Sequence, residues 1–395
     1  MQMRGITIGI PREIMPGEKR VAADPETVEK MCREGAKVFL EKGAGEGAFF
    51  SNMDYQTAGA YLVDGPEELY KNSEVIIKVK EPCYHQELKE HEVDLLREGT
   101  YLICFLHPAN PINHQVVRKL AHKNILSYTL EGVPRISRAQ QMDALTSMST
   151  VAGYRAAISA ANHLPRFIPM MPTAFGVFQP ANFLVVGTGV VGLQSIGMAK
   201  RMGAKVKALD IRQEAQEQAK SLGAEVIPFE VPPELAVGEG GYARRLPEEW
   251  YQKERQILEE ETPECDAVIL TALIPGEQSP ILLTTTAVER MANGSVVVDI
   301  AVDQGGNCEV VRPGEEYQYQ GVTISGVLNI PARLPVDATK MLSQNVWHFL
   351  QYVIKEGSLV TDTSDEVIRD TLVTVQGEIV HRGTLLSMGK HVEEE

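Results

Sequence analysis

Cysteine is scarce in this sequence, with only five among 395 residues. The five are Cys32, Cys83, Cys104, Cys265 and Cys308. Because they all lie more than twenty residues apart, no CxxC pair exists. Neither a zinc site nor a disulfide framework is indicated, and free thiols suit a reducing cytoplasm.

Long apolar runs are also lacking. The densest apolar stretch, residues 267–274, is far shorter than the ~20 residues that a membrane-spanning helix needs. The first eleven residues carry no apolar core like that of a signal peptide. We therefore expect a cytoplasmic protein, or one that is peripheral to the inner membrane through partner subunits.

Positive charge is in deficit, because 38 basic residues face 53 acidic ones for a formal net charge of −15. A negative field repels phosphate backbones and anionic lipid, so nucleic acid and membrane surfaces are not expected partners. A nucleotide cofactor remains compatible, since backbone amides at a helix start can hold its phosphates locally. With 44% hydrophobic and 23% charged residues, the chain has a globular composition, and its length fits two domains.

The N-terminal region of the chain alternates strands and helices, which predicts a parallel sheet. The expected strands are residues 6–10, 37–40, 75–80 and 101–106, with a helix over 25–34. A second nucleotide-fold unit is expected from about 183 to 326. In the tail, residues 372–375 and 378–380 read as a hairpin around Gln376-Gly377.

Two long stretches without proline, residues 139–163 and 338–356, predict helices that cross between the domains. The predicted N-terminal, substrate-side domain comprises residues 1–138 and 338–395, and the NAD-binding domain comprises 139–337. The predicted fold class is α/β. Two Rossmann-like domains with parallel sheets are joined by the two long crossing helices, with a cleft between them.

The clearest motif is Gly187-Thr188-Gly189-Val190-Val191-Gly192, which follows the apolar strand 183–186 and opens a helix that Gly203 can terminate. In this context Gly187 permits a tight turn, Gly189 lets a pyrophosphate approach the backbone, and Gly192 lets helix and strand pack closely. The alternative is a tight turn without a ligand. The strand, glycines and helix together favour a dinucleotide site.

The choice of nucleotide depends on Asp210, which ends the next strand and lies eighteen residues beyond Gly192. A carboxylate there accepts hydrogen bonds from both ribose hydroxyls and repels a 2′-phosphate. Asp210 therefore predicts NAD(H) rather than NADP(H), although the neighbouring Arg212 weakens the inference.

Over nearly its whole length the chain resembles alanine dehydrogenases and the NAD(H)-binding alpha subunit of proton-translocating NAD(P) transhydrogenase. The segments shared with both are residues 11–13, 18–22, 43–48, 299–301 and 305–306. The segments that resemble the transhydrogenase branch are 134–140, 142–145, 240–243, 271–276, 305–308 and the tail to 381.

The resemblance implies that Arg135, Gln140 and Asp143 lie beside the nicotinamide and that a loop carrying Tyr242 closes over NAD(H). Physically, the amide of Gln140 can fix the carboxamide that orients the ring, and a glycine-flanked tyrosine makes a plausible lid. Without the resemblance, Gln140 is a surface helix residue and Tyr242 an exposed loop aromatic. The full expected cofactor set is Arg135, Gln140, Asp143, Gly187, Gly189, Val190, Val191, Gly192, Asp210, Ile211, Arg212, Tyr242, Thr271, Ala272, Leu273 and Asn329.

Four further residues match the substrate set of alanine dehydrogenases, namely Arg20, Lys80, His107 and Asp303; typical transhydrogenase alpha subunits lack the last three. The resemblance implies that these four, with Gln140, form the catalytic set. Arg20 and Lys80 could clamp a carboxylate, His107 could move the substrate proton, and Asp303 could orient water or amine. Taken singly, Lys80 also fits a solvated strand end, His107 a capped loop histidine and Asp303 a turn former.

Three functions remain open from the sequence. The first is the NAD(H)-binding subunit of a transhydrogenase, which needs an NADP(H)-binding subunit and a separate membrane-spanning subunit as partners. The second is a stand-alone NAD-dependent amino-acid or imino-acid dehydrogenase of the alanine type, acting on a small-molecule substrate. The third, a non-catalytic NAD(H)-sensing module, has no positive support. No metal is indicated, and a homo-oligomer, a dimer or larger, is expected.

Overall fold

The computed structural model describes residues 2–238, 241, 243–274 and 278–390, which divide into two compact units. Unit 1 comprises Met1–Met148 and Ala332–Glu395, and unit 2 comprises Ser149–Pro331. The first boundary falls inside helix α6 (Ala144–His163). The domain limits at 138/139 and 337/338, read from the sequence, stay a prediction of where each domain could fold alone.

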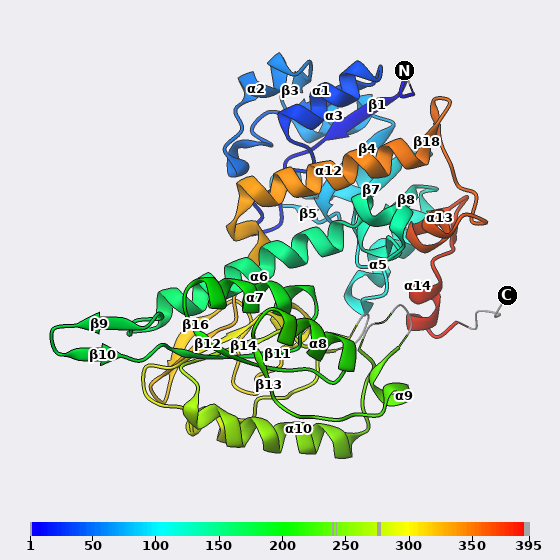
Figure 1. The fold of residues 1–395 in the computed structure, drawn as a ribbon. Coiled ribbons are helices and arrows are strands. Elements are labelled where there is room, and N and C mark those ends of the chain that lie inside the picture. Colours follow the sequence, from blue (N-terminus) through cyan, green and yellow to red (C-terminus); the bar gives the residue numbers. More distant parts are fainter. Residues whose placement is uncertain (1, 239–240, 242, 275–277, 391–395) are drawn as a thin grey trace. The chain divides into compact units, whose positions relative to one another are not determined.

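Unit 1 is built on a sheet with the strand order β21-β20-β8-β7-β4-β1-β2-β3 (Figure 1). Its strands from β3 to β8 in this order are parallel, and the C-terminal hairpin adds two antiparallel strands at one edge. The bounds are β1 Thr7–Ile10, β2 Lys37–Glu41, β3 Tyr61–Val63, β4 Val75–Lys80, β7 Tyr101–Phe105, β8 Leu126–Thr129, β20 Leu372–Val375 and β21 Glu378–Ile379. The strand order reverses between β1 and β4, which is where an open α/β sheet gathers ligands.

The helices of unit 1 begin where the local sequence predicts. Helix α1 (Pro25–Arg33) starts with proline at its first turn, and Asp24 caps it by accepting the Thr27 N–H at 2.9 Å. Its buried residues Thr27, Val28 and Met31 recur at helical spacing and face the core. The other longer helices are α3 Pro66–Asn72, α5 His114–His122 and α12 Pro335–Val353.

Unit 2 has the strand order β13-β12-β11-β14-β15-β17-β16, and only the edge strand β16 is antiparallel in this sheet of described residues. The bounds are β11 Asn182–Val186, β12 Lys205–Leu209, β13 Glu225–Val226, β14 Ala267–Leu270, β15 Val296–Asp299, β16 Glu316–Tyr319 and β17 Val322–Ser325. Strands β14 and β15 are buried along their whole length, as expected for a parallel sheet covered on both faces. Here the order reverses between β11 and β14.

The main helices of unit 2 are α7 Val190–Arg201, α8 Gln213–Ser221 and α10 Glu248–Glu261. A two-stranded hairpin, β9 (Met171–Thr173) and β10 (Gly176–Phe178), projects from the body of this unit (Figure 1). Gly203 follows α7 with φ of 88° and ends it as the sequence predicts.

One predicted element starts elsewhere. The long helix expected from residue 139 begins at Ala144, because residues Ser137–Met142 form a tighter 3₁₀ turn, η4. Asp143 then caps the helix by accepting from both the backbone N–H and the hydroxyl of Thr146, at 2.8 and 2.6 Å. The predicted tail hairpin is confirmed, with Gln376 and Gly377 both at positive φ in its turn.

Across residues 2–238, 241, 243–274 and 278–390, we find no helix whose length and apolar character would let it span a membrane. In the same residues, no three histidine, cysteine, aspartate or glutamate side chains gather in a way that could hold a metal ion.

Candidate functional site

The glycine turn between β11 and α7 has a distinct geometry at each of its three glycines. Gly187 has φ of 83°, and a Cβ on it would lie 2.9 Å from the Ala272 nitrogen. A Cβ on Gly192 would lie 2.0 Å from the Gly187 carbonyl oxygen, so helix and turn are in direct backbone contact. At Gly189 the only atom within 4 Å of an added Cβ, among the described residues, is Nη2 of Arg212 at 3.9 Å. The space above Gly189 is therefore open.

This turn fits a pyrophosphate. Gly189 is the N-cap of α7, so the amides of Val190 and Val191 belong to the helix start, where N–H groups lack intrahelical partners and the dipole favours an anion. Thr271 follows β14 across the switch point and fixes the turn by donating its hydroxyl to the Gly187 carbonyl at 2.7 Å. Ala272 and Leu273 continue this edge, and both are partly exposed.

Asp210 directly follows β12, is buried, and is already engaged with its neighbours. Its Oδ2 accepts from the Thr188 N–H at 2.6 Å. Arg212 grips both of its oxygens, from Nε to Oδ1 at 3.0 Å and from Nη2 to Oδ2 at 2.9 Å, while Ile211 packs against the core between them. The bidentate pair offsets the carboxylate charge, so repulsion of a 2′-phosphate is weaker than a bare carboxylate would give.

A buried carboxylate that the sequence analysis did not select organises the next loop. Asp299 ends β15 and accepts three backbone N–H bonds, from Ala301, Asn307 and Cys308, at 2.7–2.9 Å. Burial raises the pKa of Asp299 to about 6, against these lowering hydrogen bonds. Asn307 then bonds both the N–H and the carbonyl of Ala272 at 2.9 Å. The Gly305-Gly306-Asn307-Cys308 motif was the available signal for this support.

Asp303 and Asn329, selected from different regions of the sequence, lie together. The Asn329 N–H faces both carboxylate oxygens of Asp303 at 3.4 Å, and Asn329 has φ of 49°. Asp303 is exposed on the short turn η7 (Ala301–Gln304). Both residues belong to unit 2, at the same sheet edge as the glycine turn.

In unit 1, Arg20 has a structural partner within two residues. Its side chain is 3% exposed and forms a bidentate ion pair with Glu18, from Nε at 2.8 Å and from Nη2 at 2.6 Å. Its Nη1 also approaches the sulfur of Met148 at 3.1 Å. A guanidinium held in this way is a weaker candidate for clamping a substrate carboxylate than the sequence suggested.

Lys80 and His107 follow neighbouring strands, β4 and β7, at the carboxyl edge of the sheet. Lys80 is partly buried, whereas the His107 side chain is 39% exposed. His107 has φ of 46°, a conformation that non-glycine residues rarely adopt. It is kept there by its N–H bond to Glu131 and by ring stacking on Phe105 at 6.0 Å. Such strain gathers at functional sites.

Two carboxylates missed by sequence reasoning flank His107. Glu81 follows β4 and Glu131 follows β8, so the strand order β8-β7-β4 places them on either side of it. Oε1 of Glu131 lies 3.5 Å from Nδ1 of His107. Among the described residues, three buried side-chain polar atoms lack a hydrogen-bond partner, and Oε2 of Glu81 and Oε2 of Glu131 are two of them. Buried acceptors without partners indicate a place for a donor.

The residues expected beside the nicotinamide lie on one segment of unit 1. Arg135 and Gln140 are exposed around the turn η4, and Asp143 is occupied as the cap of α6. Tyr242 lies outside the described residues, so its predicted role as a lid stays a prediction.

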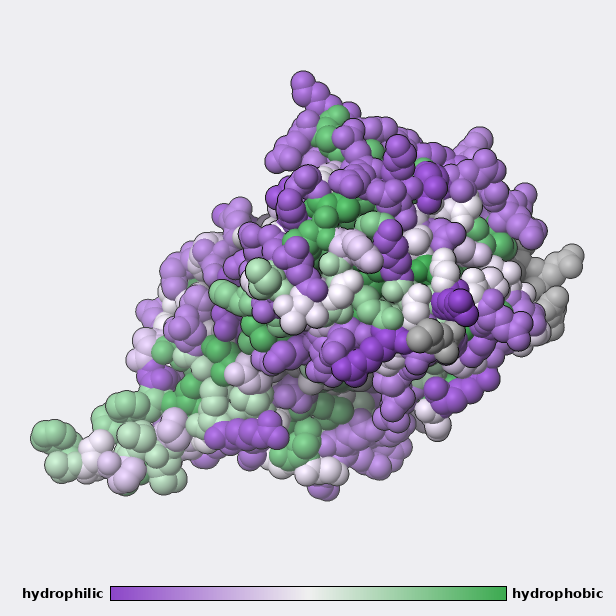
Figure 2. Space-filling view, turned by 90° about the horizontal axis from the view of Figure 1, so that it is seen from above, coloured by the Kyte–Doolittle hydropathy of each residue, from purple (hydrophilic) through white to green (hydrophobic). Residues whose placement is uncertain are grey.

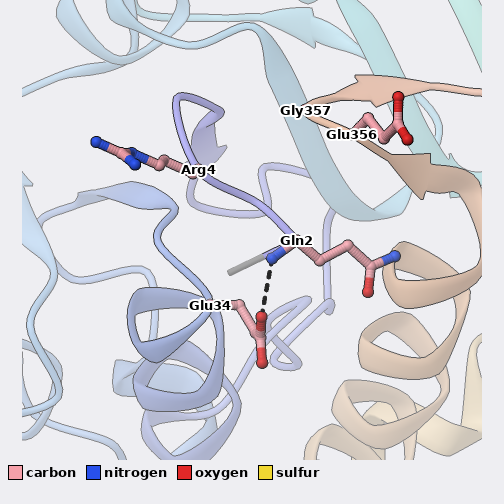
Figure 3. Close-up of a pocket in the computed structure, with 5 residues that line it drawn as sticks. All are labelled: Gln2, Arg4, Glu34, Glu356 and Gly357. Carbon is pink, nitrogen blue, oxygen red and sulfur yellow. Dashed lines mark hydrogen bonds between the residues drawn. The ribbon is translucent and has the colours of Figure 1, made fainter.

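A pocket of ≈ 490 Å³ elsewhere in unit 1 does not belong to this site. Figure 3 shows its lining, with Gln2 bonded to Glu34 and with Arg4 and Glu356 on different segments. Gln2 and Arg4 precede β1, and Glu34 precedes β2, so the pocket lies at the amino edge of the sheet. Ligands of open α/β sheets bind at the opposite, carboxyl edge.

A glycine turn at the switch point of a parallel sheet, followed by an acid on the next strand, defines a dinucleotide-binding protein of the Rossmann class. Two family profiles match the chain. "Alanine dehydrogenase/PNT, N-terminal domain" covers residues 9–152, and "Alanine dehydrogenase/PNT, C-terminal domain" covers residues 156–382. The chain belongs to the alanine dehydrogenase/PNT family.

Similar proteins come from both branches of this family. The first of the pieces that make up the NAD(P) transhydrogenase alpha subunit of Rhodospirillum rubrum is 41% identical over 377 residues, which cover 95% of this chain and 97% of that protein. "Alanine dehydrogenase" of Staphylococcus saprophyticus is 29% identical over 384 residues, 95% of each. The crystal structure of a transhydrogenase from Sinorhizobium meliloti matches with a TM-score of 0.81 at 34% identity, covering 95% of this chain and 99% of that one. The chain is an oxidoreductase, and NAD is its cofactor.

Proposed function

We propose that this chain is the NAD(H)-binding subunit of a transhydrogenase, in which hydride passes from NADH to NADP held by a separate subunit. The observation that carries the proposal is the open glycine turn with Asp210 beside it, in a chain 41% identical to a transhydrogenase alpha-subunit protein over 97% of that protein's length.

The residues divide the work of binding and orientation. The first amides of α7 bind the pyrophosphate, Gly189 leaves room for it, and Asp210 accepts from the ribose. Gln140 holds the carboxamide so that one face of the ring is presented. When bound, NAD(H) supplies the chemistry of hydride transfer, and the protein supplies position and exclusion of water. Direct transfer between two nicotinamides needs no acid or base from the chain.

The second candidate, an amino-acid or imino-acid dehydrogenase, is favoured by the unpartnered carboxylate oxygens beside His107. Lys80 would bind the substrate carboxylate, and the orphan oxygens of Glu81 and Glu131 would accept from an ammonium group. His107 would take or return the substrate proton at a ring nitrogen. Asp303 would orient water or amine. A pure transhydrogenase subunit has no use for such a set.

The partners follow from the first candidate. Hydride transfer to NADP needs an NADP(H)-binding subunit, and proton translocation needs a membrane-spanning one, which would place this chain at the cytoplasmic face of the inner membrane. A homo-oligomer is supported by the β9–β10 hairpin, where Phe175 is 99% exposed and Phe178 51% exposed. Figure 2 shows the projecting arm with a largely apolar surface. Burying it against a second copy would remove this surface from water.

One pair of variants separates the two candidates. The wild-type chain, His107→Ala and Gln140→Ala are assayed for NAD reduction with L-alanine and other amino acids, and for NADH-to-NADP-analogue exchange with an NADP(H)-binding subunit added. His122→Ala, at an exposed histidine on α5, is the control. The transhydrogenase proposal expects exchange that survives His107→Ala and weakens in Gln140→Ala.

The dehydrogenase candidate expects amino-acid oxidation by the chain alone, lowered about 10²–10⁴-fold by His107→Ala, the usual contribution of a placed acid–base group. Ordinary enzymatic turnover of an amino acid that His107→Ala abolishes contradicts the transhydrogenase proposal. A negative amino-acid screen together with partner-dependent exchange contradicts the dehydrogenase candidate.

A further inference from the structure

Strands β1 and β4 separate before β4 ends. They pair at Ile8 with Val75 and at Gly9 with Ile76, and the ladder stops there. On its other side, β4 shifts register against β7 between Ile77 and Lys80. The last residues of β4 therefore need other partners for their backbone N–H groups, because such groups are seldom left unpaired when buried.

A side chain takes the place of the missing strand. Glu13, on the segment after β1, accepts from the Val79 N–H through Oε1 at 2.6 Å and from the Lys80 N–H through Oε2 at 3.3 Å. The Glu13 side chain is 4% exposed. One carboxylate thus holds the two amides that place Lys80 at the switch point of the sheet.

Glu13 belongs to a buried group with an excess of negative charge. Lys78 is 1% exposed and bonds Oε1 of Glu92 at 2.6 Å, but lies 3.7 Å from Oε2 of Glu13. Glu92 also accepts from the Tyr70 hydroxyl at 3.0 Å and the Cys83 N–H at 2.8 Å. Lys78 is thus compensated mainly by Glu92, and Glu13 has the weaker share of the single cation.

We propose that Glu13 is the positioning residue of Lys80: its carboxylate fixes the end of β4, and its protonation loosens Lys80 from the substrate position. The inference rests on the proposed placement of Lys80 on the substrate side, in the second candidate function. It assigns Glu13 no contact with substrate.

The electrostatics place this change near neutral pH. Burial raises the pKa of Glu13 to about 7, with Lys78 lowering it and the carboxylates of Glu18 and Glu92 raising it. Tyr70 and Cys83 complete the titratable groups around the cluster. The ionised carboxylate accepts both amides, whereas the protonated acid turns one oxygen into a hydroxyl donor facing an N–H. Lys80 is therefore held above neutral pH and loosened below it.

A buried cluster that serves stability alone would leave the two amides insensitive to pH, and this can be measured. The amide ¹H and ¹⁵N shifts of Val79 and Lys80 are followed from pH 5.5 to 8.5 in the full chain and in Glu13→Gln. Glu41→Gln is the matched control, since burial also raises the pKa of Glu41 but its hydrogen bond goes to Arg12 instead of β4. Both amide signals should move with a midpoint near 7 in the wild type and in the control, and stay flat in Glu13→Gln.

Absence of a titration in the wild type, or the same titration in Glu13→Gln, overturns the proposal. Should Glu13→Gln not fold, Glu13→Asp shortens the reach by one methylene; unaltered titration of both amides in that variant also overturns it. If the chain oxidises amino acids, Glu13→Gln should raise KM for the substrate about tenfold, the scale of one lost interaction, with NADH affinity unchanged. If it does not, the second candidate function fails, while the amide titration still decides the role of Glu13.

Discussion

The three glycines of α7 and its turn allow one experiment to separate conformation, packing and cofactor space. Alanine replaces Gly189, Gly192 and Gly197 in turn. A methyl on Gly189 meets only Arg212 Nη2 at 3.9 Å, and one on Gly192 meets the Gly187 carbonyl at 2.0 Å. A methyl on Gly197 meets nothing within 4 Å of the described residues. Gly197 is therefore the matched control on the same helix.

The expected magnitudes follow from these distances. A carbon–oxygen contact needs ~3.3 Å, so Gly192→Ala must push the turn away from the helix by roughly 1.3 Å. Overpacking of this kind costs about 1–3 kcal/mol, and an ångström of misplacement at a binding turn can cost about 10²-fold. Gly189→Ala loses at most about 1 kcal/mol as a helix cap. Gly197→Ala gains about 0.5–1 kcal/mol, because alanine is the better helix former.

Thermal unfolding and titration with fluorescent NADH measure the two effects separately. Gly189→Ala should unfold near the wild-type temperature and bind NADH at least about tenfold more weakly, because its methyl occupies the space of the pyrophosphate. Gly192→Ala should lose both stability and affinity, and Gly197→Ala should lose neither. Wild-type NADH affinity in Gly189→Ala would refute the placement of the pyrophosphate over this glycine. Wild-type stability in Gly192→Ala would refute the packing argument.

Two further predictions concern a buried acid and the exposed hairpin. Glu254 on α10 is 3% exposed, and burial together with Asp210 raises its pKa to about 8. Its contribution to stability is present below its unfolded pKa and is lost as pH rises through about 8. Glu254→Gln should therefore reduce the fall in the free energy of unfolding between pH 5 and pH 9, by up to a few kcal/mol at about 1.4 per pKa unit; an equal fall in both proteins, measured by denaturant titration, contradicts this. Replacing Phe175 and Phe178 with serine should lower the mass of the particle measured by light scattering, and an unchanged oligomer would show that the hairpin is not the interface.

Local patterns were enough to predict the strands, the glycine turn and the tail hairpin. The run Val75–Lys80 was predicted with both of its ends correct because six consecutive residues form one buried strand. The turn at Gly187 follows from short-range sterics, since its φ of 83° is costly for any residue with a Cβ. The start of α6 was misjudged because proline-free sequence does not reveal that Asp143 caps the helix four residues later than expected.

The partners of charged side chains depended on tertiary structure. The sequence by itself could select Lys80 and His107, because each follows an apolar run at a strand end. It could not show that Glu13 bonds Val79, 66 residues away, or that Glu131 meets His107 across 24 residues. Strand order brings these groups together, and strand order is decided by how the sheet packs as a whole. Burial then sets which carboxylates keep their protons, because the cost of leaving a charge in a low dielectric exists only once the core has closed around it.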